Sequence, residues 1–163
     1  MFHGHLWARR SGKAGGRPPL VPIVMQPRRG SGLMTALLVD DDDAVRGFCR
    51  NLLTASGFTV LEANNGLEAF LISVQLRGAI DILITDLEMP GISGVELGRT
   101  FNELWPGVNV LYMSGSPRDT VGNQLPADCV FLPKPFAPDA LVKAIGSALV
   151  RGNGAAQECS DFR

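Results

Sequence analysis

The sequence predicts an α/β fold: a doubly wound, five-stranded parallel sheet with helices on both faces. Five short apolar runs alternate along the chain with segments in which apolar residues recur at helical spacing. This alternation is typical of parallel strands joined by right-handed helical crossovers. Four of the runs are followed by polar residues of a few kinds, and open sheets of this type bind ligands outside the carboxyl ends of their strands.

The five runs are short, rich in aliphatic residues and bounded by turn residues, as buried strands are. They cover residues 36–39, 58–61, 80–85, 108–113 and 129–132. The third run leads into Asp86 and is then stopped by Pro90 and Gly91. Asp86 is therefore expected at the carboxyl end of a core strand, although a single Asp at such a place could equally be a helix N-cap.

Four further segments are predicted to be amphipathic helices, because their apolar residues recur every three or four positions. They cover residues 45–53, 67–74, 95–104 and 141–149. Asp42 or Asp43 is expected to cap the first of them. The apolar stripe of the second comprises Leu67, Phe70, Leu71 and Val74. Residues 117–127 contain Gly122 and Pro126 and little periodicity, so the fourth helix is expected to be short or irregular.

Charge is distributed unevenly along the chain. Residues 1–33 carry six basic and no acidic residues, whereas residues 34–150 carry seven basic and fourteen acidic ones. The composition predicts a disordered basic leader over residues 1–32, one domain over 33–150 and a flexible tail over 151–163. Met34 stands directly before the first predicted strand, which makes it an alternative start of the natural protein.

The sequence favours a cytoplasmic protein. No run approaches the roughly 20 apolar residues that a membrane helix needs, and the leader is a poor signal peptide because its apolar run over 20–25 is short and contains Pro22. The three cysteines are odd in number and lack metal-ligand spacing. Cys49 and Cys129 are expected to be reduced core residues.

Polar side chains at the ends of the predicted strands are expected to converge. Asp40 and Asp41 follow the first strand, Asp86 ends the third, Ser114 the fourth, and Lys134 lies just after the fifth. Three neighbouring carboxylates repel one another, and a divalent, oxygen-binding ion such as Mg²⁺ relieves that repulsion. A carboxylate can also be a nucleophile toward phosphorus, in a transfer that depends mainly on positioning and charge neutralisation.

These motifs together resemble the response-regulator receiver domains of two-component signal transduction, which have a CheY-like, flavodoxin-like fold. The resemblance covers about residues 33–150 and includes every motif in order. The acidic pair Asp40–Asp41 comes first, followed by Asp-x-x-Met-Pro-Gly from Asp86, Met-Ser-Gly around Ser114, and Phe-Leu-Pro-Lys-Pro-Phe around Lys134.

The resemblance implies a role for each matching residue. Asp86 would be the phosphoacceptor, and Mg²⁺ would be bound directly by Asp41, through water by Asp40, and by the backbone carbonyl of Glu88. Asp86 itself would also face the metal.

It also implies how the phosphoryl group is held and sensed. Ser114 would hydrogen-bond one phosphoryl oxygen and Lys134 would pair with another, with the lysine aimed by a cis bond to Pro135. Phe131 would be the switch aromatic that turns inward as Ser114 moves; as Phe rather than Tyr, it lacks a hydroxyl for a contact inside. Glu88 could also tune the lifetime of the phosphate.

The expected function is that of a single-domain response regulator. It would accept phosphate from a histidine kinase or a histidine phosphotransfer protein, and then switch protein–protein interactions or act as a phosphate sink or shuttle. It would be no enzyme beyond its own phosphorylation and dephosphorylation. Because only a short polar stretch follows Val150 in this sequence, no output domain is expected. Neither a membrane nor nucleic acid is an expected partner of the folded domain, although the leader's arginines could touch nucleic acid.

Three alternatives stay open at this point. Asp41 and Asp42 could be the working acidic pair, since four aspartates are consecutive. The chain could be a small haloacid-dehalogenase-type phosphatase with Asp41 as nucleophile, although no second acidic pair follows Lys134. It could also be a receiver-like module that is not phosphorylated and only binds other proteins.

Overall fold

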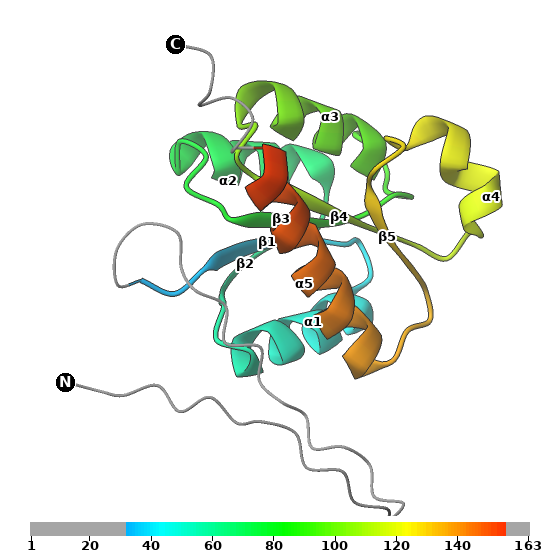
Figure 1. The fold of residues 1–163 in the computed structure, drawn as a ribbon, viewed down its shortest axis with the longest axis horizontal. Helices are drawn as coiled ribbons and strands as arrows, with labels where there is room; N and C mark the ends of the chain where they lie inside the picture. The colour runs from blue at the N-terminus through cyan, green and yellow to red at the C-terminus, as the bar shows by residue number, and fades with distance from the viewer. Residues whose placement is uncertain (1–31, 156–163) are drawn as a thin grey trace, which may run out of the picture.

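A computed structural model describes residues 32–155 of the chain. Its core is a five-stranded parallel sheet with the order β2-β1-β3-β4-β5 (Figure 1). The strands are β1 (Thr35–Val39), β2 (Thr59–Ala63), β3 (Ile82–Asp86), β4 (Asn109–Ser114) and β5 (Val130–Pro133). The predicted doubly wound α/β fold is therefore confirmed.

Helices cover both faces of the sheet, with α1 and α5 on one side and α2 and α3 on the other (Figure 1). They are α1 (Asp43–Ala55), α2 (Gly66–Gln75), α3 (Gly94–Leu104), α4 (Arg118–Val121) and α5 (Pro138–Ala155). The fourth is a single turn, continued by a 3₁₀ turn over Gly122–Gln124. This confirms the short, irregular fourth helix that the sequence predicts.

Both faces of the central strands are buried. Neighbouring residues of a strand point to opposite faces of the sheet, so each strand packs against the helices on both sides. Leu38 packs with Cys49 of α1 and Leu141 of α5 in one core cluster. Leu37 packs with Phe101 of α3 in a second cluster on the other face. The sheet is therefore packed between two apolar layers, and these layers fix the positions of its strand ends.

The strand register aligns the carboxyl ends. Val39 of β1 lies opposite Thr85 of β3, so the residues that follow them, Asp40 and Asp86, emerge side by side. Ser114 at the end of β4 lies opposite Pro133 of β5, directly before Lys134. The four polar positions that the sequence singles out consequently share one edge of the sheet.

The second helix is where the structure corrects the sequence analysis. The helix forms as predicted, but Leu67, Leu71 and Val74 are exposed, and Ala69 and Ser73 are fully buried instead. The small buried residues let α2 lie close to the sheet, and this depends on the tertiary packing. Of the predicted apolar stripe, only Phe70 is partly buried, packed against the second core cluster. The stripe therefore marks the helix but not most of its buried face.

The last helix is longer than predicted. α5 continues to Ala155, through Gly152 and Gly154, which were assigned to a tail. A helix that is already nucleated gains one hydrogen bond for each added residue, so α5 runs on through both glycines although each glycine costs about 1 kcal/mol relative to alanine. Residues 1–31 of the predicted leader (1–32) and residues 156–163 of the predicted tail (151–163) lie outside the described residues. Among the described helices, none is long and apolar enough to span a membrane.

Candidate functional site

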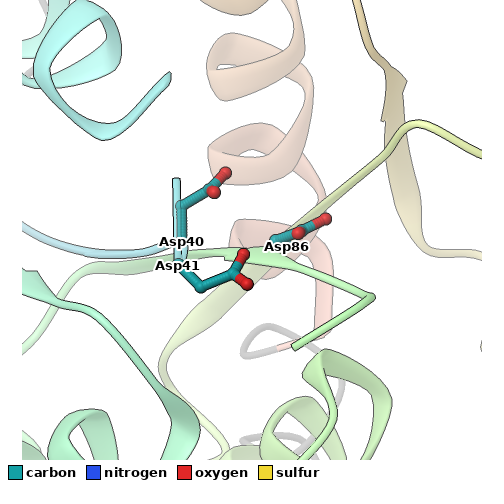
Figure 2. A group of neighbouring side chains, drawn as sticks. All are labelled: Asp40, Asp41 and Asp86. Carbon is teal, nitrogen blue, oxygen red and sulfur yellow. The ribbon is translucent and has the colours of Figure 1, made fainter. Parts of the chain in front are cut away.

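Three carboxylates meet at the carboxyl edge of the sheet. Each of Asp40, Asp41 and Asp86 offers one carboxylate oxygen, and these oxygens lie within 4.8 Å of one another (Figure 2). Asp40 is fully buried and Asp86 is 6% exposed, whereas Asp41 is open to solvent. The site therefore combines two buried acids with one that faces the surface.

Lys134 supplies the positive charge inside this cluster. Its Nζ lies 2.7 Å from Oδ2 of Asp40 and 3.3 Å from Oδ1 of Asp86. Its backbone N–H donates to the carbonyl of Ser114 at 2.7 Å, and its bond to Pro135 is cis, as the resemblance implies. The loop after β5 thus holds the ammonium between the two buried carboxylates.

Burial and charge shift the pKa values of this pair. Burial raises the pKa of Asp86, and Asp40 adds to the rise, while the nearby ammonium of Lys134 opposes it. Burial alone would lower the pKa of Lys134, but its hydrogen bond to Asp40 and the charges of both carboxylates raise it overall. Lys134 is therefore a permanent cation at neutral pH.

The acidic loop resolves which of the four consecutive aspartates join the cluster. The side chain of Asp42 accepts hydrogen bonds from the backbone N–H groups of Ala44 and Val45, at 2.8 and 3.1 Å, and caps α1. Asp43 forms an ion pair with Arg46. Asp40 and Asp41 are left to face Asp86, which favours this pair over Asp41 and Asp42.

Ser114 ends β4 at the same edge of the sheet as the acids, and Phe131 lies within β5, opposite Tyr112 of β4. Ser114 is fully buried, and its Oγ accepts the backbone N–H of Ser116 at 2.9 Å. Phe131 is half-buried, and the Arg118 guanidinium of α4 lies over its ring, 5.8 Å from the centroid. The exposed side chain of Glu88 accepts a hydrogen bond from the Ser116 hydroxyl. This contact ties the loop after β3 to the loop after β4.

The donor set fits a divalent, oxygen-binding cation. The three carboxylates have one ammonium among them, so the cluster keeps an excess of negative charge. Oδ1 of Asp86 is buried and, among the described residues, has no hydrogen bond of good geometry. Mg²⁺ prefers oxygen ligands and is commonly held by one or two carboxylates together with water. Asp40, Asp41 and Asp86 are the residues that would hold it.

One residue of the site region was missed by the sequence analysis. Nη1 of Arg46 donates to the backbone carbonyl of Asp40 at 2.7 Å. An arginine one turn after a helix N-cap, in a loop crowded with aspartates, is the signal that could have found it. Its contact with Asp40 depends on how α1 leaves the sheet.

Comparison with known proteins identifies the family of this chain. The response regulator receiver domain family matches residues 36–146. The chain therefore belongs to the response regulator receiver domain family of two-component systems. The phosphatase alternative is not supported, because the matched family is a signalling module.

Two curated relatives are similar to most of the domain in sequence. Over 121 residues the chain is 39% identical to the sensor kinase CckA of Brucella abortus, covering 73% of this chain and 13% of that protein. It is 29% identical to the response regulator receiver protein CpdR of the same organism, covering 70% of this chain and 95% of the relative.

A crystal structure of the receiver domain from the hybrid histidine kinase CckA superposes with a TM-score of 0.59 at 36% identity. It covers 71% of this chain and 98% of that domain. The chain thus matches a small part of the Brucella abortus CckA kinase and nearly all of the isolated receiver domain in that crystal structure.

Proposed function

We propose that this domain accepts a phosphoryl group on Asp86 from a phosphohistidine of a histidine kinase or a histidine phosphotransfer protein. The observation that carries the proposal is the buried carboxylate of Asp86, which lies beside the Lys134 ammonium and within the cluster formed with Asp40 and Asp41. Family membership supports the same reaction class. Residues 33–150 would be the unit that carries it out.

The transfer exchanges one bond to phosphorus for another. A carboxylate oxygen of Asp86 forms an O–P bond while the N–P bond to the donor's imidazole breaks, and the imidazole leaves with the electron pair and takes a proton. Lys134 stabilises the negative charge on the phosphoryl oxygens, at a position fixed by its ion pair with Asp40. Mg²⁺ held by the acidic cluster would supply further charge neutralisation.

Ser114 and Phe131 would report the new group. The Ser114 hydroxyl, now an acceptor for the N–H of Ser116, would instead donate to a phosphoryl oxygen. Phe131 would then turn inward and leave its contact with Arg118 of α4. Cation–aromatic contacts at solvent-accessible sites contribute about 0.5–1 kcal/mol. Arg118 is exposed, so phosphorylation could readily break this contact.

The consequence of phosphorylation would be a change in protein partners or the removal of phosphate from a kinase. Rapid return of the phosphate to its kinase would favour a sink or shuttle, and a phosphorylation-dependent complex with a third protein would favour an output role. Phosphotransfer profiling against all histidine kinases of the source organism would distinguish them.

Labelling with a small acyl phosphate in the presence of Mg²⁺ tests the proposal. The expected product is one labelled site at Asp86, found by borohydride reduction of the acyl phosphate and peptide mapping. Label at Asp41 would indicate the phosphatase alternative, and no label would indicate a module that only binds other proteins. Either of these results would overturn the proposal.

Adding Mg²⁺ to the chelator-treated protein is expected to raise its thermal stability. A ligand that binds only the folded state at about ten times its Kd contributes about 1.4 kcal/mol, or roughly 5 °C in Tm for a domain of this size. Differential scanning fluorimetry would measure the shift. Asp40→Asn should lose it, and Asp128→Asn, a change at an exposed acid before β5, should keep it. An equal shift in both variants would place Mg²⁺ binding elsewhere.

A further inference from the structure

Arg46 forms a bridge between the acidic loop and the neighbouring edge strand. It lies in the first turns of α1, and its side chain is only 16% exposed. Nη1 donates to the carbonyl of Asp40 at 2.7 Å, Nη2 pairs with Asp43, and Nε lies 3.4 Å from Oε1 of Glu62 in β2. One guanidinium thus contacts the end of β1, the start of α1 and the strand beside them.

Arg46 contacts the backbone of Asp40 and does not occupy its carboxylate. Arg46 binds the backbone carbonyl of Asp40, while Oδ1 accepts the N–H of Asp42 at 2.9 Å and Oδ2 accepts from Lys134 at 2.7 Å. The Asp40 N–H donates to Ala63 of β2 at 3.2 Å. The peptide groups on both sides of the Asp40 Cα are therefore fixed, and this sets the direction of its side chain.

We propose that Arg46 is a positioning residue for the metal site, holding the loop after β1 so that Asp40 and Asp41 face Asp86. This inference rests on the metal-binding part of the proposed function and extends it to a residue that touches none of the three carboxylates through its own side chain. The rigid fork of a guanidinium suits this role, since it can donate in several fixed directions at once.

The sign of a mutational effect separates positioning from simple electrostatics. Arg46 is a cation near a site for a divalent cation, so removing its charge should by itself tighten Mg²⁺ binding. If Arg46 acts by positioning, its removal should instead weaken binding, because the carboxylates lose their alignment. Loss of residues that orient metal ligands typically weakens metal affinity by about 10–100-fold.

Calorimetric titration of the unphosphorylated full chain with MgCl₂ would test this. Arg46→Ala is expected to raise the Kd about 10-fold, and Arg46→Lys, which keeps the charge but cannot reach all three acceptors, should fall between it and wild type. Arg50→Ala is the matched control, since Arg50 also pairs with Glu62, at 3.2 Å, and has no contact with Asp40 in the described structure. It should bind within about 2-fold of wild type.

The possible outcomes separate this inference from the proposed function. Unchanged or tighter Mg²⁺ binding by Arg46→Ala would overturn the positioning role while leaving the metal site intact. No binding by wild type would overturn the metal site itself. Circular dichroism would check folding; if the alanine variant does not fold, Arg46→Lys decides, with weaker binding than wild type in support and equal or tighter binding against.

Discussion

Asp86→Asn is expected to abolish acyl phosphate labelling of the protein. The amide that replaces the carboxylate is not a nucleophile toward phosphorus, and two of the neighbouring acids are already engaged in other contacts. Asp40 is already hydrogen-bonded to Lys134 at 2.7 Å, and Asp42 caps α1. Labelling should therefore fall to background, measured as incorporated radiolabel after a fixed incubation with the phosphodonor and Mg²⁺.

The same variant is expected to be more thermostable than wild type when Mg²⁺ is absent. Burial raises the pKa of Asp86 in the folded protein, so the folded state holds this proton more tightly than the unfolded chain does. For a carboxyl group shifted in this direction, stability is lost as pH rises through the folded pKa. Wild type carries this cost at neutral pH and the Asn variant does not, so the Tm of the Asn variant in EDTA should be higher than that of wild type.

Two controls make the result specific. Asp128→Asn removes an exposed acid far along the chain from the cluster and should change neither labelling nor Tm. The stability gain of Asp86→Asn should shrink as the pH is lowered below the ordinary carboxyl range, where Asp86 is protonated in both states. Residual labelling of the Asn variant, or a Tm below that of wild type in EDTA, would contradict this account of the site.

The sheet edge could be predicted because it depends on local patterns. Apolar runs ending at Asp86 and Ser114 identify strands, and parallel strands bring their carboxyl ends to one edge. The convergence of these residues with Lys134 follows from that topology, and the observed register places them together. The family's motifs then supply roles that spacing alone cannot give.

Other features could not be predicted because they depend on tertiary packing. The buried face of α2 is formed by Ala69 and Ser73, whose small size matters only against the sheet that they approach. The contact of Arg46 with the Asp40 carbonyl likewise depends on how α1 leaves the end of β1.

Gly94→Ala is expected to destabilise the fold and impair phosphorylation together. Gly94 begins α3, and a Cβ built on it would lie 2.0 Å from the carbonyl oxygen of Asp86 and 3.0 Å from the Cα of Leu87. Both atoms belong to the backbone, so no side-chain rotation can relieve the clash. Either α3 or the end of β3 must move, at a cost of about 3 kcal/mol, the upper part of the range for overpacking.

The movement would act on the site because the end of β3 carries the acceptor. The N–H of Leu87 donates to the carbonyl of Met113 at 2.9 Å, and the N–H of Gly94 donates to the carbonyl of Leu87 at 3.2 Å. Displacing this segment would shift Asp86 relative to Lys134. In the wild-type protein Oδ1 of Asp86 lies 3.3 Å from Nζ of Lys134. We therefore expect slower labelling even at temperatures where the variant is folded.

Gly47→Ala in α1 is the matched control for this substitution. Gly47 is also a helical glycine, but a Cβ there would meet nothing within 4 Å. Replacing an unhindered helical glycine by alanine stabilises a helix by about 1 kcal/mol. The urea unfolding midpoint of Gly47→Ala should therefore rise, while that of Gly94→Ala should fall. If both substitutions shifted the midpoint in the same direction and by the same amount, the explanation would be wrong: the close approach of α3 to β3 would not account for the glycine at position 94.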